Sequence, residues 1–258
     1  MASDMAEVKP NLIGGQWHAG EHASANINPS DTDDIIAHYA TATTDDVEAA
    51  IAAADAVAHD WARSGIQARH DILRTASDEI MARREDIGRL LSREEGKTLA
   101  EGIGETVRAA QIFNFFAGET LRLAGEKLPS VRTGVDVEIT REPIGVVGVI
   151  TPWNFPVAIP AWKIAPAICY GNPVVFKPAE LVPGCAWAMV DILHRAGMPS
   201  GTINLVNGPG SVVGQAMLDD ARVKAMTFTG SQATGERVAQ ASVRHMRKFQ
   251  LEMGGKNP

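Results

Sequence analysis

Four short segments of the 258-residue chain place polar or ionisable side chains directly after apolar stretches. The first runs from Thr151 to Pro156 and holds Asn154 between two prolines. Because proline fixes the backbone, this loop can present the Asn154 amide as a fixed donor toward negative charge developing on an oxygen. An asparagine that caps the following helix gives the same pattern. The segment alone leaves both interpretations open.

The second segment contains Lys177 and Glu180, which follow the apolar run 173–176. A lysine at the carboxyl end of a strand can donate to ribose hydroxyls or to a phosphate. A nearby carboxylate can accept from the two hydroxyls of an adenosine ribose. Lysine and glutamate are also common on protein surfaces, so this pair carries little weight by itself.

The third and fourth segments are glycine-containing turns at 207–214 and 228–231. The first departs from the Gly-x-Gly-x-x-Gly pattern by one residue, and glycines at the start of a helix leave unpaired amides available to a ligand. In the second turn, Gly230 allows close backbone approach and Ser231 begins a helix, which suits a pyrophosphate. Ser231 as a simple N-cap is the alternative, and the two roles are compatible.

A last acidic position, Glu252, stands in an apolar run ahead of a double glycine, within the segment Leu251–Lys256. An isolated carboxylate in such a place is suited to general-base chemistry. A glutamate that faces water from an edge strand is the commoner explanation.

The elements that must position these segments alternate between apolar strands and helices. Strands are predicted at 144–150, 173–176, 202–206 and 225–228, and helices at 157–169, 185–196, 210–218 and 231–243. Such apolar strands are buried on both faces, and helical crossovers between them imply a parallel sheet. We therefore expect an α/β fold with a doubly wound sheet flanked by helices, whose ligands bind at the carboxyl ends of the strands.

The first part of the chain is predicted to be mainly helical after a few short strands. The strands, at 11–17 and around 35–36, indicate a small β layer near the surface. A helix at 47–61 follows a start signal at residues 44–46. Two longer patterns, 66–95 with a break near Arg84 and 99–123, predict further helices, and Gly96 is expected to end the first of them.

A half-exposed strand is predicted between these two parts. Val135, Val137 and Ile139 alternate with polar residues. The strand is a candidate for a sheet extension or an oligomer contact, and a plain edge hairpin explains the pattern equally well.

Composition excludes several classes of protein. A net charge of -7 offers no basic stripe for nucleic acid. No apolar run approaches the ~20 residues of a membrane span and no signal peptide is evident, so we expect a cytoplasmic protein without a membrane partner. Cys169 and Cys185 lie in no disulfide or metal-ligand spacing, and we expect reduced thiols and no metal site.

Taken in order, segments 151–156, 176–180, 228–231 and 251–256 closely resemble the aldehyde dehydrogenase superfamily. The resemblance extends over the chain through Gly14-Gly15-Gln16-Trp17, Asn28-Pro29, Glu94-Glu95-Gly96-Lys97 and Arg141-Glu142-Pro143-Ile144-Gly145. It implies a Rossmann-like dinucleotide-binding core at 144–258, an oligomerisation arm at 126–143, an N-terminal part of the cofactor domain at 1–125, and a catalytic domain that this chain lacks. A homo-oligomer is implied for the complete protein.

The resemblance also implies a reaction in which a cysteine thiolate attacks an aldehyde, hydride passes to NAD(P), and water hydrolyses the thioester. Asn154 resembles the oxyanion-hole amide, Glu252 the general base, and Lys163 a residue with hydride-transfer or proton-relay roles. Lys177 and Glu180 resemble the ribose-binding pair, and Ser231 the pyrophosphate contact. The other expected cofactor-cleft positions are Ile150, Thr151, Pro152, Trp153, Gly210, Val213, Gly214, Phe228, Thr229, Gly230, Met253 and Gly254, with Glu252 beside them.

The chain departs from the family pattern at the nucleophile. In the family the cysteine follows the Leu-Glu-x-Gly-Gly-Lys segment by a few tens of residues, but this chain stops at Pro258, and Cys169 and Cys185 both precede Glu252. We expect a fragment of an aldehyde dehydrogenase that is inactive as given. A natural half-protein that binds cofactor or a partner without catalysis is the alternative.

The cofactor and the product can be predicted in part from the sequence. Glu180 should repel a 2′-phosphate and favours NAD, whereas Lys177 permits NADP. Glu252 argues for release of a free acid, against acyl-CoA-forming or phosphorylating relatives. The substrate cannot be predicted, because the resemblance implies an aldehyde pocket supplied largely by segments around and beyond the missing cysteine, although the general character resembles broad-specificity or semialdehyde-oxidising members.

Overall fold

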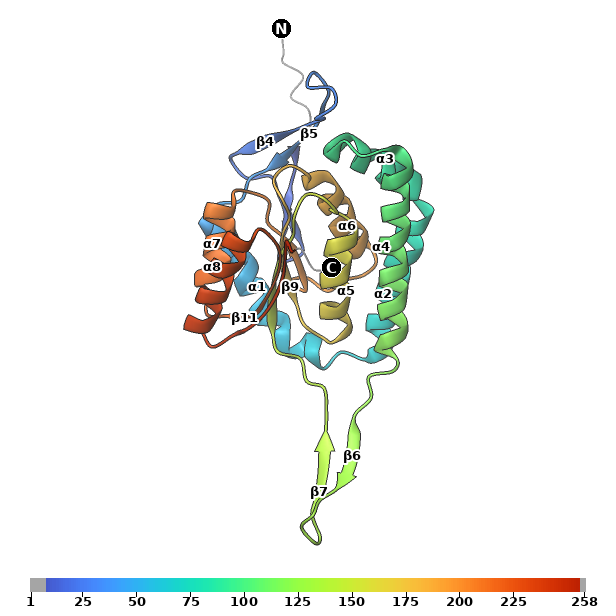
Figure 1. The fold of residues 1–258 in the computed structure, drawn as a ribbon, viewed down its shortest axis with the longest axis vertical. Coiled ribbons are helices and arrows are strands. Elements are labelled where there is room, and N and C mark those ends of the chain that lie inside the picture. Colours follow the sequence, from blue (N-terminus) through green and yellow to red (C-terminus); the bar gives the residue numbers. More distant parts are fainter. Residues whose placement is uncertain (1–7, 256–258) are drawn as a thin grey trace.

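Seven strands form the central sheet of the computed structural model, which describes residues 8–255 (Figure 1). From edge to edge they are β12 (Lys248–Met253), β11 (Val223–Gly230), β8 (Val146–Ile150), β9 (Val174–Lys177), β10 (Ile203–Leu205), β2 (Asn11–Ile13) and β3 (Gln16–His18). The first five run parallel to one another, β2 pairs antiparallel with β10, and β3 pairs antiparallel with β2. The parallel core confirms the predicted α/β class.

Helices cover both faces of the sheet, as the alternation of elements predicted. One face carries α1 (Thr44–Ala62), α7 (Gln215–Asp219) and α8 (Gln232–Arg244); the other carries α5 (Ala158–Cys169) and α6 (Pro183–Arg195), with α2 (Ile66–Ala82), α3 (Arg84–Glu95) and α4 (Leu99–Thr120) beyond them (Figure 1). A short π-helical turn, η1 (Gly210–Gly214), precedes α7. The sheet is therefore doubly wound.

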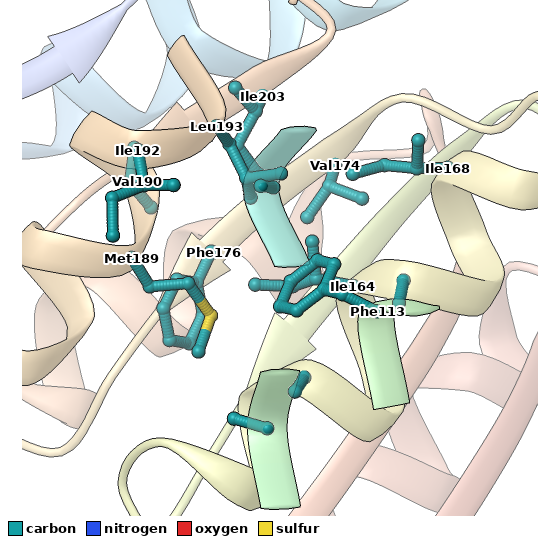
Figure 2. Close-up of a cluster of buried hydrophobic side chains, with 14 of the residues drawn as sticks. Phe113, Ile164, Ile168, Val174, Phe176, Met189, Val190, Ile192, Leu193 and Ile203 are labelled. Carbon is teal, nitrogen blue, oxygen red and sulfur yellow. The ribbon is translucent and has the colours of Figure 1, made fainter. Parts of the chain in front are cut away.

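The core between the sheet and helices α4 to α6 fixes the strand ends. Figure 2 shows Phe176 of β9 among apolar side chains of these helices, including Phe113, Ile164 and Met189. All four side chains are at most 2% exposed. Full burial of each such side chain contributes roughly 1.5–3 kcal/mol, so the strands form a rigid base for the loops that follow them.

Local signals in the first half of the chain begin and end the helices where the sequence predicted. Thr43 and Asp46 form a capping box at the start of α1. The predicted break near Arg84 separates α2 from α3, and Gly96, with φ of 86°, ends α3 in the left-handed region that favours glycine.

The N-terminal strands differ in part from the expected surface layer. β1 (Val8–Lys9), β4 (Ala23–Ile27) and β5 (Ile35–Ala40) form a separate three-stranded sheet. The hairpin of β2 and β3 instead extends the central sheet, where Leu12 pairs with Leu205 and is fully buried. The expectation of one surface layer was wrong for this hairpin because nothing in its local pattern encodes a partner so distant in sequence.

The arm projects from the body as a two-stranded hairpin (Figure 1). Its strands are β6 (Glu126–Pro129) and β7 (Asp136–Ile139), which pair antiparallel. Leu128, Val137 and Ile139 are all more than 40% exposed. The arm therefore leaves apolar side chains without a partner in the described residues.

Candidate active site

The strand order creates a crevice at the carboxyl ends of β8 and β11. After β8 the chain builds β9 and β10 on one side, then returns to place β11 and β12 on the other. Loops that leave β8 and β11 therefore diverge, which is where doubly wound sheets bind ligands. A cavity of about 1040 Å³ lies at this point.

The cavity brings together nearly all of the residues singled out in the sequence. The expected residues that line it are Ile150, Thr151, Pro152, Trp153, Asn154, Lys177, Glu180, Gly210, Gly214, Phe228, Thr229, Gly230, Ser231, Glu252, Met253 and Gly254. Val213 is not among them, because its side chain is fully buried in the core beneath η1. Lys163 lies in a second, smaller cavity of about 510 Å³.

The same crevice has lining residues that sequence reasoning missed. Three of them, Thr234, Arg237 and Val238, come from the first two turns of α8. Their spacing of three, six and seven residues from Ser231 places them on the same helix face, so helical periodicity could have found them. Arg237 brings into the crevice a cation that the sequence motifs did not predict.

Asn154 lies in the loop between β8 and α5, exposed at the lip of the crevice. No hydrogen bond of its side-chain amide occurs within residues 8–255, so it does not cap α5 in this structure. The N-cap of α5 is Val157, whose side chain has no capping group. The side-chain amide is thus available to a ligand, while the main-chain carbonyl of Asn154 accepts from Lys97.

Lys177 and Glu180 lie beside the start of this loop, where the amide of Thr151 donates to the carbonyl of Lys177 at 3.3 Å. Lys177 is only 5% exposed, and its Nζ donates to the carbonyl of Pro178 at 2.8 Å. Burial lowers the pKa of Lys177 to about 8, and the charge of Glu180 opposes that shift. Oε1 of Glu180 accepts from the amide of Gly210 at 3.2 Å, which ties the two loops together.

Ser231 is the N-cap of α8. Its hydroxyl accepts from the amide of Thr234 at 3.4 Å, as expected for a cap. The glycine before it is packed closely, since a Cβ at Gly230 would meet the Phe228 ring at 2.6 Å. This turn therefore offers the start of a helix, where amides and the dipole favour an anion, at the wall of the crevice.

Glu252 and Lys163 are connected through one side chain. Nζ of Lys163 donates to Thr227 Oγ1 at 2.8 Å and to Gln250 Oε1 at 3.1 Å, and Gln250 Nε2 donates to Glu252 at 2.9 Å. Burial lowers the pKa of Lys163 to about 8, against the opposing charge of Glu252. Glu252 itself is exposed on the edge strand β12 and touches both cavities.

The two cysteines do not belong to this site. Cys169 ends α5 and Cys185 lies in the first turn of α6, and both are free and fully buried. Burial raises the pKa of each thiol, which disfavours the reactive thiolate. Neither cysteine is a nucleophile for chemistry in the crevice.

Residues 8–255 lack two further kinds of feature. No group of three or more His, Cys, Asp or Glu side chains is arranged to hold a metal ion in that range. Nor does any helix there have the length and apolarity needed to cross a membrane.

The sheet order and the crevice at its switch point define a Rossmann-like fold. Solved structures share it: the betaine aldehyde dehydrogenase of Staphylococcus aureus in complex with NAD+ superposes with a TM-score of 0.93 at 33% identity, over 97% of this chain and 50% of that one. A structure described as an E. coli NADP dependent enzyme gives a TM-score of 0.94 at 33% identity, over 99% of this chain and 53% of that one.

Sequence comparison identifies the family. The model of the aldehyde dehydrogenase family matches residues 17–258, and the chain belongs to this family. The α-ketoglutaric semialdehyde dehydrogenase of Bacillus subtilis is 45% identical over 96% of this chain and 51% of its own length. The mitochondrial succinate-semialdehyde dehydrogenase of Arabidopsis thaliana is 36% identical over 96% and 47%. The chain thus spans about half the length of these relatives.

Proposed function

We propose that this chain is the cofactor-binding half of an NAD(P)-dependent aldehyde dehydrogenase, which oxidises an aldehyde to a carboxylic acid. One observation carries the proposal. A single crevice gathers an unbonded amide, a buried lysine with a nearby carboxylate, a helix start and an exposed carboxylate, on Asn154, Lys177, Glu180, Ser231 and Glu252.

The residues present fit a dinucleotide. Lys177 and Glu180 would bind the adenosine ribose, and the first turn of α8 at Ser231 would receive the pyrophosphate. The close packing at Gly230 explains the glycine in this turn, because any side chain there would meet the Phe228 ring. When bound, NAD(P)+ supplies the acceptor for a hydride.

The chain's own residues would act on the carbonyl. The Asn154 amide would donate to the oxygen that becomes negative when a thiolate attacks the aldehyde carbon. Glu252 would take a proton, either from the thiol or from the water that later hydrolyses the thioester, so that a free acid and the thiol are released. The thiol would come from a segment outside this chain, since both of its own cysteines are buried elsewhere.

We infer NAD as the preferred cofactor and a semialdehyde as the substrate. Glu180 lies where a 2′-phosphate would be repelled, although Lys177 and Arg237 lie in the same crevice and permit NADP. Several relatives are named for semialdehydes, among them α-ketoglutaric and succinate semialdehyde, which supports that substrate class.

We further propose that the complete protein is a homo-oligomer that uses the arm. Its support is the exposed apolar row of Leu128, Val137 and Ile139 on the hairpin of β6 and β7. Sedimentation of the complete protein with and without Val137→Lys and Ile139→Lys would detect the association.

The cofactor proposal is tested by titrating this chain with NAD+ and NADP+ while following tryptophan fluorescence, because Trp153 is 53% exposed at the crevice. We expect saturable quenching with tighter binding of NAD+, and weaker quenching in Ser231→Pro. Absence of binding by both the chain and the complete protein would overturn the proposal.

The catalytic proposal needs the complete coding sequence. We expect it to read on into a cysteine motif and its product to reduce NAD+ in the presence of a semialdehyde. A stop codon directly after Pro258 would favour a non-catalytic cofactor-binding module instead.

A further inference from the structure

The loop that carries Asn154 is held by charged side chains from the N-terminal helices. Lys97, between α3 and α4, donates from Nζ to the main-chain carbonyl of Asn154 at 3.1 Å. The same ammonium lies 4.5 Å from the centre of the Phe155 ring. Two consecutive residues of the loop thus contact one cation that lies 57 positions earlier in the sequence.

A buried carboxylate holds the other end of the loop. Glu105 of α4 accepts at Oε1 from the amides of Val157 at 2.9 Å and Ala158 at 3.0 Å, where α5 begins. Its second oxygen, Oε2, lies 2.6 Å from Nζ of Lys97. One ion pair therefore holds the loop from the carbonyl of Asn154 to the start of α5.

This pair is almost removed from solvent. The side chains of Lys97 and Glu105 are 11% and 3% exposed, and Glu95, 2.9 Å from the ammonium, is 11% exposed. Burying an ion pair is a poor way to gain stability, because desolvation offsets the attraction. What the pair does supply is a fixed geometry, since each charge finds its hydrogen-bond partners in one arrangement only.

We propose that Lys97 and Glu105 are positioning residues for the oxyanion amide of Asn154. The Asn154 side chain bonds to no residue within 8–255, so among these residues its main chain alone limits where the amide can lie, and Lys97 holds that main chain at its carbonyl. An amide that stabilises negative charge is effective only when it is preorganised, and small displacements cost large factors in rate. This inference rests on the proposed function of Asn154.

The kinetic test uses the complete enzyme with Lys97→Met and Glu105→Gln. Glu94→Gln is the matched control, because Glu94 is an equally buried carboxylate that binds the start of α6 and not the Asn154 loop. We expect kcat to fall roughly 10–100-fold in the two loop variants, with the KM for NAD+ changed by less than about twofold. The control should retain kcat within about twofold.

A second comparison separates positioning from general destabilisation. In an Asn154→Ala background, Lys97→Met should lower kcat by no more than about twofold further, since the group it positions is already gone. Full additivity of the two substitutions would overturn the proposal. So would an unchanged kcat in Lys97→Met, whereas an inactive wild type would refute the proposed function instead.

A readout that needs no catalysis is available in the 258-residue chain itself. With selectively ¹⁵N-labelled asparagine, the order parameter of the backbone amide of Asn154 should fall in Lys97→Met and stay unchanged in Glu94→Gln. If the order parameter in Lys97→Met equals that of the wild type, the ion pair does not hold the loop. This measurement on the 258-residue chain also tests the proposal if a loop variant of the complete enzyme fails to fold.

Discussion

Two buried glutamates anchor two neighbouring helices in the same way but in different electrostatic surroundings. Glu105 binds the amides of Val157 and Ala158 at the start of α5. Glu94 binds those of Gly184 at 2.5 Å and Cys185 at 2.8 Å at the start of α6. Lys97 neutralises Glu105, whereas no cation pairs with Glu94 among residues 8–255.

The two glutamates differ in charge compensation, and among the described residues only the helix that follows the proposed oxyanion loop has a compensated one. Burial raises the pKa of Glu94 to about 7, although the amides of Gly184 and Cys185 oppose that shift. The anchor of α6 therefore changes charge near neutral pH. The anchor of α5, which follows the proposed oxyanion loop, carries a counter-ion. Lys97 thus lies beside the loop whose geometry is proposed to matter for the reaction.

Removing the cation should have the largest effect on stability. Lys97→Met in this chain leaves Glu105 and Glu95 without their shared partner, and we expect the free energy of unfolding to fall by about 3–5 kcal/mol. Urea unfolding followed by circular dichroism measures it. The double variant Lys97→Met, Glu105→Gln should lose less than the single one. A loss under about 1 kcal/mol for Lys97→Met would erase the distinction between the two anchors.

The pH dependence of stability should come from the unpaired anchor. Burial raises the pKa of Glu94 from its ordinary value of 4.5 to about 7, so the folded state binds this proton more tightly than the unfolded state. Glu94 therefore contributes at most about 3 kcal/mol to the free energy of unfolding. This contribution is complete below about pH 4.5 and is lost as the pH rises through about 7.

The matched variant isolates this contribution. Between pH 4.5 and 7, wild-type stability should decline relative to Glu94→Gln, whose side chain does not titrate. Thermal or urea unfolding of both proteins across that range gives the difference. Parallel stability curves would contradict an uncompensated, ionisable Glu94.

The smallest effect is expected at α8, which has a cap of its own. Ser231→Ala removes one local hydrogen bond at an exposed position, so unfolding should become easier by only about 1 kcal/mol. Ser231→Asn, which can also cap, should be nearly neutral. If Ser231→Ala costs as much as Lys97→Met, the ranking of local and long-range anchors is wrong.

These anchors mark the limit of what the sequence could predict. The strand and helix alternation, the turn at Gly230 and the Asn154 loop depend on neighbours in sequence, and the structure places them as expected. Glu94 and Glu105 act on amides 52 to 91 positions away. The N-caps of α5 and α6 are Val157 and Val182, whose side chains cannot cap, so the absence of a capping residue pointed to a more distant partner.

Other parts of the site were out of reach for similar reasons. Val213 was expected in the cleft because of its place near the glycines, yet the π-helical turn η1 directs it into the core. The link from Lys163 to Glu252 through Gln250 requires helix α5 to lie beside strand β12, and this packing is a tertiary property.

The antiparallel hairpin of β2 and β3 also constrains how this molecule can assemble. The amide of Gly14 donates to Asn204 Oδ1, a residue 190 positions later, and Leu12 pairs with Leu205. Closing such a long loop costs entropy that only the finished β10 repays. The hairpin of β2 and β3 must therefore wait for β10, which lies far later in the sequence, before it can join the sheet.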